Sequence, residues 1–242
     1  MSFVNESLTK WNKSEPFELQ VARGQIRGHS VVNIFGFNTS VGTSFITPWE
    51  LNTQYPFLSS AHQLSIVSTS ASDTGRIVII SGLDASYNSI TESITVNGTT
   101  PVTTTNAFLR INSMSAGDGT IIGNITASYD GTVYAQITDG VGRTQMAQYT
   151  VPAGHTFYLY RINGWSATAT GNQYISFRNR VTTLTATFDV AQATFTSSQF
   201  EVQRRLPFAY AEKFNLQLQC KSSSSTNDVA LAAEGILIKN LE

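Results

Sequence analysis

The composition of the 242-residue chain is that of a nearly neutral, polar protein that still has enough apolar residues to fold. Lys and Arg number 15 against 16 Asp and Glu, a net charge of -1, which argues against binding nucleic acid by neutralising its phosphates. Charged residues make up 13% of the chain, against about 25% in ordinary soluble domains, whereas Asn, Ser and Thr together make up about 30%. A hydrophobic share of 41% excludes general disorder.

Two further classes of protein are disfavoured by simple counts. Cys220 is the single cysteine, which excludes an internal disulfide and any metal site built from several cysteines. No run of about 18 apolar residues occurs, so we expect no membrane-spanning helix and no membrane partner. The first thirty residues contain no apolar run like the core of a secretory signal, so we expect no signal peptide there.

The first part of the chain predicts an extended N-terminal arm over residues 1–27. It mixes Trp11, Phe17 and Leu19 with scattered charges and has no clean period. Such an arm either lies across a neighbouring subunit or forms a partly ordered terminus. Helical periodicity is short and rare, and we expect helix only over 5–11 and 206–213.

From residue 29 onward, short apolar segments separated by turn signals predict β-strands. Asn97-Gly98 and Asp130-Gly131 are strong hairpin signals. Leu184, Ala186, Phe188 and Val190 alternate with polar residues, as on the half-buried face of a strand. The predicted strand-rich segments, in chain order, are 31–42, 63–72, 75–84, 90–98, 101–112, 121–140, 146–168, 174–180, 183–198, 200–223 and 229–240.

This spacing favours an all-β, antiparallel β-sandwich of jelly-roll-like type over alternating βαβ units. We place a boundary near residue 145, which divides the body into a first β-sandwich subdomain (28–145) and a second, jelly-roll-like one (146–242). A single continuous sandwich is the alternative.

Several strand segments resemble a widespread family of structural virion proteins of tailed bacteriophages. They are SSAHQLSIVSTSASDTG (59–75), ISGLDASYNSITESITVNGTTPVTTTNAFLRIN (80–112), AQYTVPAGHTFYLYRI (147–162) and RLPFAYAEKFNLQLQ (205–219). They occur in the family's order over about two thirds of the chain and mark a β framework, not a chemistry. The sequence departs from the family at Asp73-Thr74-Gly75, where a longer glycine-containing loop is expected.

The resemblance implies a non-enzymatic protein that acts by binding. We expect a decoration or cement protein that bridges neighbouring capsomers on the outside of the capsid, in virions assembled in the bacterial host cytoplasm. Its expected partners are the major capsid protein, other virion proteins and further copies of itself, as a dimer or trimer. The low charge suits interface cores. The predicted contact residues are Trp11, Phe17, Arg23, Arg27, Arg204 and Arg205.

Two other functions stay open at the level of the sequence. One is a tail, collar or fibre-attachment role in the virion. The other is a carbohydrate-binding β-sandwich module, in which exposed aromatic rings stack on sugars; the ordinary role of such rings is core or interface packing. The candidate aromatic residues are Trp49, Tyr158, Tyr160, Tyr174 and Trp165, and we expect Trp165 to be the most exposed.

Catalytic and metal-binding patterns are weak. The sequence contains no HExxH, GxSxG or CxxC motif, and His29, His62 and His155 are expected to be ordinary polar residues. Asp118, Asp130 and Asp139 adjoin glycines and could bind calcium, although Asp-Gly is itself a turn signal. Cys220 is expected to be buried and inert. We therefore predict no enzyme activity, no cofactor and no metal.

Overall fold

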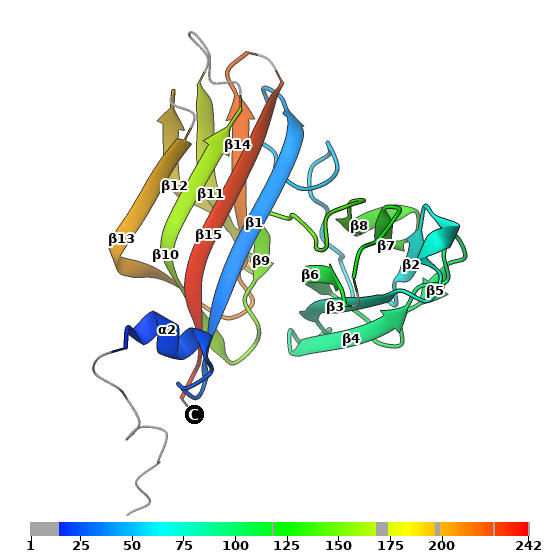
Figure 1. Cartoon of the computed structure of the whole chain (residues 1–242). Helices are drawn as coiled ribbons and strands as arrows, with labels where there is room; N and C mark the ends of the chain where they lie inside the picture. Colours follow the sequence, from blue (N-terminus) through cyan, green and yellow to red (C-terminus); the bar gives the residue numbers. More distant parts are fainter. Residues whose placement is uncertain (1–14, 118, 168–173, 197–198, 225, 242) are drawn as a thin grey trace, which may run out of the picture.

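The computed structural model describes residues 15–117, 119–167, 174–196, 199–224 and 226–241. The protein is all-β: in this part of the chain fifteen strands form four sheets, and every strand pairing between them is antiparallel (Figure 1). The all-β, antiparallel expectation is therefore confirmed. No helix among the described residues is long and apolar enough to cross a membrane.

Two of the sheets share one hydrophobic core. The first sheet has the order β1 (His29–Val41), β15 (Asn227–Lys239), β10 (His155–Ser166), β13 (Gln199–Tyr210). The second has the order β12 (Thr187–Phe195), β11 (Ile175–Thr182), β14 (Asn215–Ser222), β9 (Gln148–Thr150). Their inward side chains form one buried cluster, which includes Phe157 and Leu231 from the first sheet and Phe177 and Leu218 from the second.

The other two sheets enclose a second core. One contains β5 (Val102–Thr103), β2 (Ser65–Ser68), β7 (Ile125–Tyr129) and β8 (Thr132–Ile137); the other contains β4 (Ser89–Thr95), β3 (Ile77–Leu83) and β6 (Arg110–Ala116). Their buried cluster runs from Trp49 to Met146 in the sequence. Figure 1 shows these sheets beside the first pair, as a smaller body next to β1 and β9.

The division of the chain differs from the predicted subdomains at one strand. The prediction groups residues 28–145, but β1 pairs with β15 along almost its whole length, from His29↔Ile238 to Val41↔Asn227. Ile34 and Val41 of β1 lie in the core that contains residues 147–237. The smaller body, residues 49–146, is thus inserted between β1 and β9.

Gly36 of β1 lies against both the segment by which the chain leaves the larger body and the segment by which it returns. The Ala147 N–H donates to the Pro48 carbonyl at 2.9 Å, so the outgoing and returning segments are hydrogen-bonded to each other. A Cβ at Gly36 would lie 2.3 Å from both of these backbone atoms. Any larger residue would separate the two segments from β1.

Two local predictions are corrected. Residues 206–213 were expected to be helical, but β13 continues to Tyr210, because Phe157, Tyr158 and Leu159 of β10 pair with it there. The expected extended arm contains a short helix, α2 (Phe17–Ala22), that packs on β1 of the same chain and buries Gln20 and Val21. Residues 1–14, with the expected helix over 5–11, lie outside the described residues.

Candidate functional site

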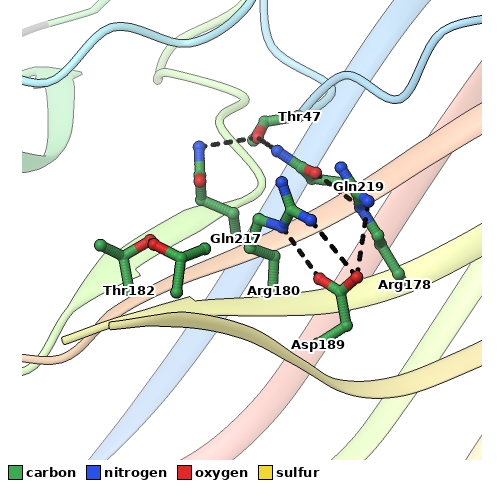
Figure 2. Close-up of polar contacts among 8 residues, drawn as sticks. Thr47, Arg178, Arg180, Thr182, Asp189, Gln217 and Gln219 are labelled. Atoms are coloured by element: carbon green, nitrogen blue, oxygen red, sulfur yellow. Dashed lines mark hydrogen bonds and ion pairs between the residues drawn. The ribbon is translucent and has the colours of Figure 1, made fainter. Parts of the chain in front are cut away.

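The outer face of the second sheet is occupied by the protein itself, and we call it the covered face. Gln217 and Gln219 of β14 point outward but are buried, with Gln219 only 1% exposed. Both side-chain amides donate to the Thr47 hydroxyl, at 3.0 and 3.4 Å. Figure 2 shows Thr47 lying over these two strand residues. The segment that leads from β1 to the inserted body therefore satisfies amides that would otherwise face solvent.

Charged side chains on the covered face are also paired. Asp189 of β12 accepts from Arg180 at 2.9 Å and from Arg178 at 3.4 Å (Figure 2). Hydrogen bonds from Arg180 lower the pKa of Asp189 against the effect of its desolvation, and the two positive charges add to this. Arg178 also lies 4.0 Å from the centre of the Phe45 ring. The contact between Arg178 and Phe45 holds the connecting segment on the sheet.

The outer face of the first sheet, which we call the open face, is different. Strand register places side chains in rows across it: Phe35, Ala232, Asn163 and Glu201 form one row, and Phe37, Ala230, Trp165 and Gln199 form the next. Trp165 is 44% and Phe35 37% exposed. Between these two large rings the central strand contributes only two alanine methyl groups.

This alternation of large and small side chains creates a groove. Its volume is about 420 Å³. The sheet-face groove, as we call it, is lined by Phe35, Asn163, Gly164, Trp165, Gln199, Phe200, Glu201, Ala230, Leu231 and Ala232. Packing requires glycine at position 164, because a Cβ there would lie 2.2 Å from the Phe200 ring. The groove is therefore built by β1, β15, β10 and β13 together.

A second hollow of about 310 Å³ continues along the same face toward α2. Arg161 crosses it and is paired with Glu234 at 2.7 Å and with Glu201 at 3.6 Å. The hydrogen bonds that Arg161 donates to Glu234, together with the negative charge of that carboxylate, raise the pKa of the exposed Arg161. The positive charge beside the groove is thus neutralised by two carboxylates.

The structure separates the predicted contact residues. Arg204 lines the second hollow, with its guanidinium 3.7 Å from the Phe208 ring centre, and Arg205 next to it is exposed. Phe17 lies on α2 with its ring against His29, and Arg23 is paired with Glu15 at 2.6 Å. Arg27 lies in the loop before β1, and its carbonyl oxygen is 3.0 Å from the His29 ring. Trp11 lies outside the described residues.

The predicted aromatic platform is divided in the same way. Trp49 is only 1% exposed; it donates to the Thr53 carbonyl and packs edge-on against Tyr55, so it has the ordinary role of core packing and is not part of the candidate platform. Trp165 is exposed, as expected, and lines the sheet-face groove. Tyr160 lines the second hollow, and exposed Tyr174 precedes β11 on the other sheet.

The histidines and loop aspartates have local partners. His62 lies 2.8 Å from the Ser60 hydroxyl and stacks on Tyr129, but among the described residues no carboxylate is hydrogen-bonded to it. A serine nucleophile would need such an oriented base. Asp130 has φ 48° before Gly131 with φ 73°, the geometry of a tight hairpin turn. Asp118 lies outside the described residues. Among the described residues, no group of three or more His, Cys, Asp or Glu side chains could hold a metal ion.

Asp73 is a structural residue that the sequence did not single out. Its buried carboxylate accepts from the Ser68 hydroxyl at 2.5 Å and from the N–H groups of Ile122 and Gly123 at 2.8 and 2.9 Å. Desolvation raises the pKa of Asp73, but these hydrogen bonds outweigh it and the net shift is downward. Asp73 thus links the short loop at 73–75, where the sequence departs from the resemblance described above, to the loop that contains Ile122 and Gly123 in the inserted body.

Arg110, which connects the two bodies, and Glu50, which connects the two ends of the inserted body, were also missed. Arg110 of β6 donates to Asn215 of β14 at 2.8 Å and to the Leu58 and Leu109 carbonyls. Glu50 accepts a hydrogen bond from the Gln145 N–H, and burial raises the pKa of its carboxyl to about 7. Both residues follow or interrupt apolar runs, which is the only sequence signal that they carry.

Cys220 lies in the core between the two sheets, fully buried. Desolvation raises the pKa of its thiol, so the thiolate is disfavoured. This agrees with the expected inert cysteine.

Comparisons with known proteins give little further guidance. No protein-family model and no curated protein matches the sequence. A chain in a structure of infectious bursal disease virus Gx strain is 8% identical, with a TM-score of 0.23, over 93% of this chain and 77% of that chain. A chain from the Gt strain is 8% identical, with a TM-score of 0.20, over 89% and 78%. Likeness at this level does not establish a shared fold.

Proposed function

We propose that this protein is a non-enzymatic structural protein of a tailed-phage virion, which binds the outside of the capsid and bridges neighbouring capsomers. The observation that carries the proposal is the strand order of the larger body. Numbered along the chain, its eight strands lie in the order 1-8-3-6 in one sheet and 5-4-7-2 in the other. This order supports the jelly-roll interpretation, and the eight-stranded jelly roll is an architecture of viral capsid and lectin domains.

The same architecture hosts many functions, so further support is needed. The four strand segments quoted above resemble tailed-phage virion proteins, and they include parts of both bodies. A body inserted between the first and second strands adds a second β surface to the jelly roll without interrupting its core. A subunit with two joined bodies has the shape needed to contact two neighbours.

The proposed contact with the shell is the β13 segment that contains Arg205 and Leu206. Leu206 is 82% exposed, and Arg205 is exposed beside it. β13 is an edge strand of its sheet, with hydrogen-bonding groups free on one side for a neighbour. An apolar side chain next to a cation on such an edge suits an acidic, partly apolar protein partner.

Electron cryo-microscopy of particles carrying the labelled protein tests the proposal. We expect label over the icosahedral faces in a fixed number of copies. The double variant Arg205→Glu/Leu206→Asp should fold and lose binding to purified shells. Leu184→Asp, at a similarly exposed leucine in the β11–β12 turn, is the matched control and should bind.

Other distributions would overturn the capsid proposal. Label confined to one vertex or to the tail would replace decoration by a tail, collar or fibre-attachment role. Absence of label from the particle would remove both virion functions. Full shell binding by the double variant would reject the β13 edge as the contact.

A further inference from the structure

We infer that the sheet-face groove binds a neutral oligosaccharide. The inference does not depend on a place in the virion, since it rests on the groove alone. A volume of about 420 Å³ lies within the range of about 300–1,000 Å³ typical of small-molecule sites.

The groove has the shape that a sugar ring requires. Phe35 on β1 and Trp165 on β10 lie in adjacent rows with β15 between them. With neighbouring strands about 4.8 Å apart and a rise of about 3.4 Å per residue, their positions are roughly 12 Å apart along a diagonal of the sheet. The floor consists of the methyl groups of Ala230 and Ala232. A pyranose fits between the rings with one face on the indole, where its C–H groups meet the electron-rich aromatic surface.

Polar groups lie where the hydroxyl groups of such a sugar would point. Asn163 occupies the same row as Ala232 and Glu201, so its amide and the Glu201 carboxylate border the floor on the side of β10 and β13. Within the described residues the Asn163 side chain makes no hydrogen bond, which leaves both a donor and an acceptor for a ligand. An amide beside a carboxylate can accept from, and donate to, adjacent hydroxyls.

Charge selects a neutral sugar over an acidic one. Glu201 is the single charged residue among those lining the groove. The nearest cation, Arg161, is already paired with Glu201 and Glu234. An anionic sugar or a phosphate would therefore meet uncompensated negative charge, whereas hydroxyl groups would find acceptors.

Intrinsic fluorescence and a glycan array test this inference on the purified full chain. The array should contain neutral hexose and N-acetylhexosamine oligosaccharides, with sialylated and sulfated glycans for comparison. We expect binding to a neutral class and a change in tryptophan emission that disappears in Trp165→Phe. Trp165→Ala should weaken binding about tenfold or more, as expected when a stacked ring is lost.

A matched control distinguishes binding in the groove from nonspecific binding to any exposed aromatic ring. Tyr174→Ala removes a ring with 42% exposure outside the groove and should bind like the unmodified protein. Asn163→Ala should weaken binding while the urea midpoint stays unchanged. Equal losses in Tyr174→Ala and Trp165→Ala would overturn the inference.

Three further results would contradict it. No binding to neutral glycans at millimolar concentration is one, and preference for sulfated or sialylated glycans is another. The third is a change of oligomeric state in Trp165→Ala by sedimentation equilibrium without glycan binding, which would assign the groove to contacts between copies. None of these outcomes bears on shell binding, so the two proposals can fail separately.

Discussion

The two sheets of the larger body have similar inner faces and opposite outer ones. On the covered face, outward-pointing Gln217 and Gln219 are buried under Thr47. On the open face, Trp165 and Phe35 are exposed although they are large and apolar. Polar residues are thus hidden where the segment between β1 and the inserted body crosses the second sheet, and aromatic residues are exposed where no described segment covers them. An exposed aromatic pair next to a hollow marks a place for a partner.

The largest effect is expected at the junction on the covered side. Arg110→Ala removes three hydrogen bonds and a cation from beside the Phe57 ring, 4.9 Å away. It leaves two carbonyls and Asn215 without this donor. We expect the unfolding free energy to fall by about 2–4 kcal/mol, with separate urea transitions for the two bodies.

Arg143→Ala is the matched control for the junction, because Arg143 is an exposed arginine of the inserted body. It should change stability by no more than about 0.5 kcal/mol. If Arg110→Ala unfolds in one transition at an unchanged urea midpoint, the two bodies are not held together by this residue.

A pH effect of intermediate size is expected from Glu50, on the segment that runs over the covered face. Its pKa is about 7 in the folded protein, against 4.5 for the ordinary group, because of desolvation. Between these values the folded protein keeps a proton that the unfolded chain has lost. Its contribution to stability is therefore full below about pH 4.5 and falls by about 1–3 kcal/mol as the pH rises through 7.

Urea unfolding between pH 4.5 and 8 checks this contribution. Glu50→Gln should flatten the decline, because the amide does not titrate. Glu18→Gln, at an exposed carboxylate on α2, should leave the decline as it is. An identical pH profile for Glu50→Gln and the unmodified protein would assign the decline to other groups.

A smaller effect is expected from the Thr47 hydroxyl, which links the segment between β1 and the inserted body to the second sheet. Thr47→Val keeps the shape of a fully buried side chain but removes the acceptor of both Gln217 and Gln219. The expected loss is about 1–2 kcal/mol by urea unfolding. Thr182→Val, which breaks the exposed 3.1 Å contact with Thr187, should cost less than about 0.5 kcal/mol. Equal losses of unfolding free energy in the two variants would mean that the segment over the covered face is not held by Gln217 and Gln219.

The sequence predicts local features of this molecule better than long-range ones. Alternation and turn signals predict the strands, and the return of the chain near residue 145 is visible as a change of segment. The pairing of β1 with β15 joins residues about 200 positions apart, and both strands are 13 residues long. Nothing in the local pattern of β1 distinguishes this partner from the strands that follow it.

The groove lies beyond sequence prediction for the same reason. Trp165 could be expected to be exposed, because it follows Gly164 near the end of a strand. Its position diagonally across β15 from Phe35, however, depends on two registers that meet at β15. Trp49 shows the opposite case: in an irregular connection the sequence allows it either an exposed platform or core packing, and its indole is enclosed by the inserted body.

The smallest change in stability is expected on the open face. Trp165 stands on the surface of a sheet whose core lies on the other side, and 44% of it is exposed. Trp165→Ala should therefore change the unfolding free energy by no more than about 0.5 kcal/mol, as surface substitutions usually do, and Tyr174→Ala should behave in the same way. Urea unfolding of both variants checks this. A loss of unfolding free energy above about 1.5 kcal/mol in Trp165→Ala alone would show that the ring stabilises the fold. That result would count against a binding role, because a ring that the native state does not need is the one available to bind something else.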